Sequence, residues 1–172
     1  MATKKQKEIS LIEIAIIVLI IGMLICTIFI ALDPVSRYKQ ARDIVRQNAV
    51  EEISHSIKSY QSNNGNFILP SITSTKIGET YLITTGKSID CTLNNRLCQK
   101  PISGETNCVD LSGLLRGNYL EKIPISPSGN IRWDSGKQEN QNGTGYTLTR
   151  NSDGNVTIQS CESETRKIIK SN

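Results

Sequence analysis

The chain has 172 residues and a formal net charge of +4. This length accommodates one compact domain together with a membrane segment. Seven of the 20 basic residues form two short clusters, at residues 4–7 and 37–46, and the sequence has no extended basic run. Such clusters are typical of an orientation signal and a solvated helix face, so no nucleic-acid partner is predicted, and no small-molecule ligand is evident.

Residues 1–8 form a short basic leader, and residues 9–32 form an apolar run whose single charged side chain is Glu13. A helix needs about 20 apolar residues to span a bilayer, so the run is predicted to be a transmembrane helix. An ionised carboxylate among lipid tails costs about 2.5 to 3.5 kcal/mol, which predicts a partner or an interfacial position for Glu13. A cleavable secretory signal is the competing interpretation, but its apolar core is only about 7 to 15 residues long.

The lysines of the leader favour a cytoplasmic N-terminus, although the second basic cluster weakens the charge asymmetry. The remainder of the chain is then predicted to lie outside the cytoplasm.

A second, amphipathic helix is predicted over residues 33–62. Pro34 lacks an amide hydrogen, so a kink or short break is expected there. The charged residues Arg42, Asp43 and Arg46 are predicted to lie mostly on the solvated side. Apolar residues recur at helical spacing on the opposite side, at Val35, Tyr38, Ala41, Val45, Ala49, Ile53, Ile57 and Tyr60.

Residues 63–162 are predicted to form a β-rich globular head, and residues 163–172 a flexible tail. The fold class is therefore α+β, with the long N-terminal helix packed against a small antiparallel sheet. A hairpin turn is predicted at residues 151–154 and a short capped helical turn at 110–115. The predicted strands are residues 81–85, 130–133, 146–150 and 156–159.

Four cysteines follow the apolar run: Cys91, Cys98, Cys108 and Cys161. An even number of cysteines in an exported domain predicts two disulfides. Their spacing does not favour a zinc site, because no short ligand pairs and no nearby histidine accompany them. Three pairings are possible, and the preferred one joins Cys91 to Cys98 and Cys108 to Cys161. The fifth cysteine, Cys26, lies inside the apolar run as a small apolar residue.

No catalytic arrangement is evident in the sequence. His55 is the only histidine and is predicted on or beside the polar face of the second helix. No phosphate-binding glycine loop or nucleophile with a plausible base is present, so an enzyme is not predicted.

The sequence SLIE at residues 10–13, followed by an apolar stretch with Gly22 nine residues after the acid, resembles the prepilin segment of type IV pilins and type II secretion pseudopilins. The resemblance implies that a peptidase cleaves the leader before Ile9, that the new N-terminus is methylated, and that subunits assemble into a helical filament. It also implies that Glu13 pairs with the N-terminal amine of a neighbouring subunit. The implied partners are a prepilin peptidase and an assembly platform in the inner membrane.

Two positions depart from that family pattern. Glu8 stands where the family has glycine, and Ile9 stands where it usually has phenylalanine. Without cleavage, no free amine exists at Ile9 to pair with Glu13. The head also resembles short pilins and major pseudopilins, at residues 60–67, 119–124 and 143–146.

Many major pseudopilins bind calcium in the head through an aspartate. Ser126 occupies the corresponding position here, so a calcium site would require Asp134, Glu139 or Asp153. No other cofactor is predicted.

These features predict a structural subunit of a type IV pilus or pseudopilus-like filament, serving adhesion, motility, DNA uptake or secretion. The subunit would cross the membrane once, with an extracytoplasmic head, and would reach the cell surface in the filament. The alternative is a permanently anchored extracytoplasmic binding or adhesion module that keeps its leader.

Overall fold

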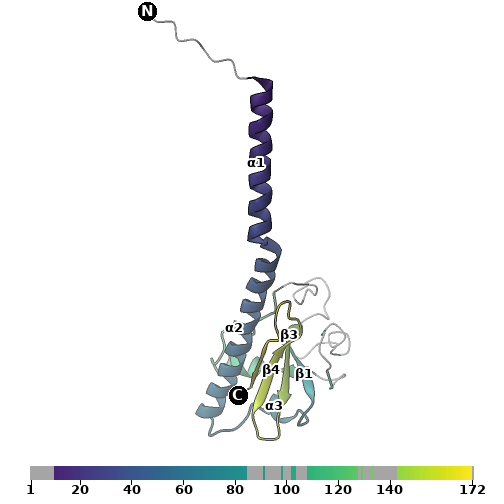
Figure 1. The fold of residues 1–172 in the computed structure, drawn as a ribbon. Helices are drawn as coiled ribbons and strands as arrows, with labels where there is room; N and C mark the ends of the chain where they lie inside the picture. Colours follow the sequence, from purple (N-terminus) through teal and green to yellow (C-terminus); the bar gives the residue numbers. More distant parts are fainter. Residues whose placement is uncertain are drawn as a thin grey trace, which may run out of the picture. The chain divides into compact units, whose positions relative to one another are not determined.

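The computed structural model describes residues 10–84, 91, 98, 102–103, 108–127, 129, 133 and 143–171. The chain divides into two compact units, Met1–Tyr38 and Lys39–Asn172. A long N-terminal helix dominates the first unit, and a small sheet dominates the second (Figure 1). The α+β class predicted from the sequence is thus confirmed.

Helix α1 (Leu11–Leu32) is apolar on every side. Its large hydrophobic side chains are between 48% and 86% exposed, because no other part of the described chain covers them. By length and composition, the helix containing this stretch is the one described helix that could cross a membrane.

The first helix is interrupted at Asp33, which adopts the left-handed conformation with φ 34° and ψ 66°. Helix α2 (Pro34–Asn63) begins immediately afterwards. The Asp33 carboxylate accepts a hydrogen bond from the Ser36 amide at 3.4 Å, and its carbonyl accepts one from the Arg37 amide at 3.3 Å. Proline suits the first helical position because its missing N–H would have no partner there. The predicted break at Pro34 is therefore present.

The second unit contains a five-stranded sheet in the order β2-β1-β3-β4-β5. Strand β2 runs parallel to β1, and the other neighbours are antiparallel, so the predicted purely antiparallel sheet is wrong. Two short helices complete the described unit. The elements are α3 (Pro70–Thr73), β1 (Thr80–Thr84), β2 (Cys108–Asp110), α5 (Ser112–Arg116), β3 (Gly143–Arg150), β4 (Val156–Ser160) and β5 (Ile169–Ser171).

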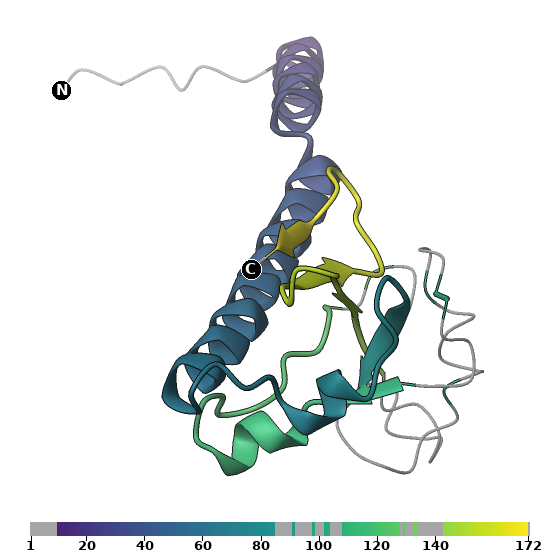
Figure 2. The same ribbon diagram turned by 90° about the horizontal axis from the view of Figure 1, so that it is seen from below.

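The main core lies between α2 and one face of the sheet (Figure 2). Because side chains alternate along a strand, Tyr81 and Ile83 of β1 join this core, whereas Leu82 packs on the opposite face with Trp133. The α2 side chains of the main core are Ala49, Val50, Ile53 and Ile57, which pack in one cluster with Tyr146, Leu148, Val156 and Ile158 of β3 and β4.

Local predictions for the head agree with most of the observed elements. The predicted strands 81–85, 146–150 and 156–159 correspond to β1, β3 and β4. In the β3–β4 turn the Asn151 amide donates to the Asn155 carbonyl at 2.9 Å. The helical turn predicted near residue 110 is α5, where the Asp110 carboxylate accepts the Ser112 amide at 2.8 Å. The predicted strand 130–133 lies, except for Trp133, outside the described residues.

The prediction of a flexible tail at residues 163–172 is wrong. Residues 169–171 form β5, which pairs with β4 through Gln159 and Ile169. Ile168 is 5% exposed and belongs to the main core. Burying this one large side chain contributes about 1.5 to 3 kcal/mol, which offsets part of the entropy cost of ordering the residues around it. The head therefore extends to residue 171.

Candidate functional site: an uncovered helix and a buried charge cluster

The N-terminal end of α1 carries the acid that the sequence analysis singled out. Glu13 lies in the first helical turn, where its amide donates to the Ser10 carbonyl at 2.9 Å. A carboxylate is favoured at this end because the helix dipole is positive there. The predicted cleavage residues Glu8 and Ile9 lie outside the described part of the chain.

Gly22 lies in the middle of α1, where glycine is unfavourable for helix stability. A Cβ atom placed on it would meet nothing within 4 Å. No close contact among the described residues therefore requires a glycine at this position. Small residues in apolar helices commonly allow another helix to approach closely.

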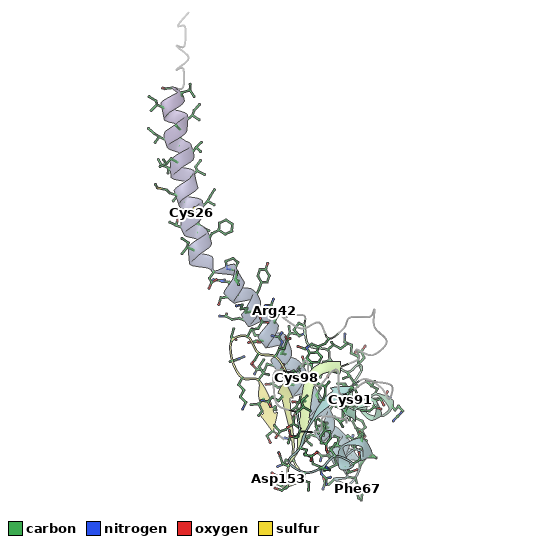
Figure 3. All side chains as sticks on the ribbon, turned by 90° about the vertical axis from the view of Figure 1, so that its right-hand side faces the viewer. Cys26, Arg42, Phe67, Cys91, Cys98 and Asp153 are labelled. Carbon is green, nitrogen blue, oxygen red and sulfur yellow. A yellow bond between two sulfur atoms is a disulfide. The ribbon has the colours of Figure 1, made fainter. Side chains whose placement is uncertain are left out.

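The head contains a buried cluster of five charged residues, with Arg46 at its centre. The Arg46 side chain is 0% exposed and contacts three carboxylates. Its Nη1 atom lies 2.8 Å from Asp43 Oδ1 and 2.9 Å from Glu164 Oε1, and its Nη2 atom lies 3.3 Å from Glu162 Oε2. The fifth member, Arg42, pairs with Glu164 from the partly exposed edge of the cluster and is labelled in Figure 3.

Two uncharged groups complete the hydrogen bonding of Arg46. Its Nε atom donates to Ser126 Oγ at 3.1 Å, and Nη2 donates to the Pro127 carbonyl at 3.2 Å. All three guanidinium nitrogens thus have partners, which is the condition under which a buried charge is tolerated. The cluster joins three chain segments: α2, the loop at residues 126–127 and the segment after β4.

The Asp43 carboxylate holds the chain reversal between β4 and β5. It accepts hydrogen bonds from the Glu164 amide at 3.1 Å and from the Thr165 amide and hydroxyl, both at 2.7 Å. Burial alone raises the pKa of Asp43, but these bonds and the one from Arg46 outweigh it and lower the pKa to about 2. The hydrogen bond from Arg42, followed by that from Arg46, lowers the pKa of Glu164 to about 2 despite its desolvation.

The sequence analysis missed this cluster. It assigned Asp43 and Arg46 to the solvated side of α2, whereas they are 1% and 0% exposed. The predicted apolar stripe is buried only from Ala49 onward, and Val35, Tyr38 and Val45 remain exposed. The one feature of the sequence that could have indicated the cluster is the acidic pair Glu162 and Glu164 after β4. An acidic pair does not by itself identify the basic side chains that it contacts.

Two disulfides are present, as predicted, but their pairing differs from the preferred one. The bridges join Cys91 to Cys108 and Cys98 to Cys161, with Cα separations of 5.7 Å and 4.8 Å. The expected bridge between Cys108 and Cys161 is excluded by the strand order. Cys108 lies on β2 and Cys161 directly after β4, and with β1 and β3 between them the separation is about 14 Å at the usual strand spacing. Disulfides require Cα atoms within about 7 Å.

Both bridges lie on the sheet face opposite α2, where Cys98, Cys108 and Cys161 cluster with Leu82 and Trp133. Cys91 and Cys98 are labelled in the head in Figure 3. Cys161 is followed directly by Glu162 of the charge cluster. Among the described residues Cys26 of α1 is the free cysteine, and it is exposed.

The described part of the head contains His55 and one of the three calcium candidates, Asp153. No group of three or more His, Cys, Asp or Glu side chains there is arranged to hold a metal ion. Asp153 accepts hydrogen bonds from the Asn155 amide and side chain, at 2.9 Å and 2.8 Å. The other calcium candidates, Asp134 and Glu139, lie outside the described residues. His55 is exposed, and its Nδ1 atom lies 3.5 Å from Ser59 Oγ.

Comparisons of the chain with protein-family models, with curated proteins and with solved structures each find no match. Function must therefore be argued from the residues and the geometry above.

Proposed function

We propose that this protein is a structural subunit of a type IV pilus or pseudopilus-like filament, assembled from the membrane through α1. The uncovered state of α1 carries the proposal. This helix is 22 residues long, and its large side chains lack cover within the described chain. Lipid tails can cover it before assembly, and the same helix of other copies can replace them afterwards.

Glu13 and Gly22 support this interpretation over that of a plain anchor. A plain anchor gains only the favourable helix-dipole interaction from an acid in its first turn, whereas a filament can also pair that acid with a neighbour's N-terminal amine. Gly22 has open space around it within its own chain, which leaves room for the close approach of another helix.

The disulfides support an extracytoplasmic head, since such bridges persist mainly in oxidising compartments. The lysines of residues 4–7 would then remain in the cytoplasm. A prepilin peptidase and an assembly platform in the same membrane are the partners that this arrangement requires.

Substitution of Glu13 tests the proposal. Glu13→Gln and Glu13→Ala should leave the chain in the membrane, because removing a charge eases insertion. Incorporation into filaments should fall sharply, since the neighbour's amine loses its partner. The measurement compares the membrane and sheared-filament fractions by immunoblot, with Cys26→Ser as a control that alters α1 without touching its charge. Normal filaments from Glu13→Ala would remove the role proposed for the acid.

Glu8 favours the second candidate, a permanently anchored extracytoplasmic module. On this alternative, the bulky charged side chain of Glu8 fits poorly in a peptidase site shaped for glycine, so processing of the unaltered chain is slow or absent. Glu8→Gly should therefore increase the cleaved fraction on co-expression with a matching prepilin peptidase, as measured by gel shift. The double variant with Glu13→Ala should be cleaved but assemble poorly. Complete cleavage of the unaltered chain before Ile9 would leave the anchored alternative without its main support.

A further inference from the structure

The basic cluster that follows the apolar helix contains two kinds of residue. Arg42 and Arg46 are held in the head by Glu164, Asp43 and Glu162. Arg37 and Lys39 are exposed, and no described acid lies within ion-pair distance of either. Half of the cluster is thus paired with acids of the head, whereas the two basic residues nearest to α1 have no described ion-pair partner.

Arg37, Tyr38 and Lys39 are consecutive residues of α2. At 3.6 residues per turn, consecutive side chains point about 100° apart, so these three span about 200° of the helix circumference. A protein partner would require its contact residues on one face. A lipid headgroup layer, in contrast, meets the helix from every side.

The position along the chain also suits a headgroup layer. At 1.5 Å per residue, α1 is about 33 Å long, close to the roughly 30 Å of a hydrocarbon core. Arg37–Lys39 follows Leu32 by five to seven residues, or within about 10 Å of chain path along the helices. Arginine and lysine side chains are long enough to reach back toward the phosphate groups. Tyr38, at 70% exposure, is of the aromatic type enriched at this depth.

Asp33 supplies the negative charge that the helix dipole favours at the start of α2, and the first turn itself contains no acid, so Arg37 and Lys39 outnumber Asp33 by one charge. Positive side chains near this end leave a local excess of positive charge within the described chain, which external anions can neutralise.

We propose that Arg37, Tyr38 and Lys39 form a collar that binds anionic lipid headgroups and fixes the depth of α1 in the bilayer. The collar depends on the membrane-spanning part of the proposed function and not on filament assembly. For a subunit that leaves the membrane, release of these headgroups is one of the costs of extraction.

Lipid selectivity measures the collar directly. The full chain is reconstituted into phosphatidylcholine vesicles containing a trace of spin-labelled phosphatidylglycerol or phosphatidylcholine, and the fraction of each label immobilised by the protein is compared. One basic residue near an anionic surface contributes about 1 kcal/mol, which sets an upper limit of about fivefold per charge on the preference for phosphatidylglycerol. We expect a preference of about two- to fivefold at low salt and almost none at 1 M salt, where the screening length is about 3 Å.

Arg37→Gln with Lys39→Gln should clearly reduce the preference, and the lysines of residues 4–7 account for what remains. The matched control is Lys58→Gln with Lys167→Gln, which removes the same charge from exposed positions of the head and should leave the preference unchanged. A preference of about one in the unaltered chain, or an equal loss in both double variants, would overturn the collar. A third result would also overturn the collar. If Arg37→Gln with Lys39→Gln keeps its lipid preference but no longer self-associates in pure phosphatidylcholine, these residues contact a second copy of the chain and not lipid. Absence of filaments from the unaltered chain would count against the proposed function and leave the collar intact.

Discussion

Helices α1 and α2 follow one another in the chain, yet their side chains have opposite environments. Helix α1 exposes its apolar side chains and contains one acid. Helix α2 exposes many of its charges, buries four aliphatic residues against the sheet and completes its buried face with Asp43 and Arg46. Helix α2 thus buries its apolar side chains within the chain, whereas those of α1 remain available to be buried against other molecules.

This difference separates residues that stabilise the head from residues that serve assembly. Changes around Arg46 or at the disulfides should alter the stability of the head, whereas changes at Glu13 or Gly22 should alter the association of the chain with other copies. The following predictions test the stability side of that division, from the largest expected effect to the smallest.

Arg46→Ala should have the largest effect on the head. It removes the cation that Asp43 and Glu162 both contact, and breaking a buried pair in this way typically costs about 3 to 5 kcal/mol. The full chain is unfolded with urea in detergent, and unfolding is monitored by the fluorescence of Trp133. Arg42→Ala, at the partly exposed edge of the cluster, is the matched control and should cost clearly less. Equal losses would show that burial does not set the energetics of the cluster.

The two disulfides should contribute unequally. Their sequence separations are 63 residues for Cys98–Cys161 and 17 for Cys91–Cys108. In the chain-entropy treatment these loops correspond to about 4 and about 3 kcal/mol. Replacing each pair by serine and comparing urea midpoints tests the order. A larger loss for Cys91→Ser with Cys108→Ser would mean that native contacts, and not loop length, determine the contribution of each bridge.

Acid should weaken the head by a smaller amount. The pKa values of Asp43 and Glu164 are lowered to about 2 in the folded state, so their contribution is complete above the unfolded values near 4 and is lost as the pH falls toward 2. At pH 3 we expect a loss of about 1 to 3 kcal/mol relative to pH 7. Urea titrations at several pH values measure it. Asp43→Asn should show a flatter pH dependence, and an identical profile would contradict the assignment to Asp43.

The sequence predicted those parts of the fold that depend on local pattern. The apolar run, the amphipathic helix, strands β1, β3 and β4 and the hairpin turn at residues 151–154 each have their own periodicity or turn residues. Strand β5 and the parallel strand β2 are only three residues long and have no such pattern. Their pairing is decided by contacts distant in sequence, including the burial of Ile168.

The charge cluster and the disulfide pairing could not be predicted for the same reason. Asp43 and Arg46 have the sequence appearance of any exposed helical pair, and their burial depends on residues 162–165, more than a hundred positions later. The cysteine pairing follows from the strand order, because that order separates Cys108 from Cys161. The residues at the predicted cleavage point, Glu8 and Ile9, lie outside the described part of the chain, so their role is argued from the sequence alone.

The most direct test of the central claim is the intact mass of the chain recovered from filaments sheared off the cell surface. Filament assembly through α1 predicts that this fraction contains the chain, that it begins at Ile9, and that both disulfides are closed. A chain found only in the membrane fraction, with the leader through Glu8 still attached, would contradict the filament account and identify α1 as a permanent anchor.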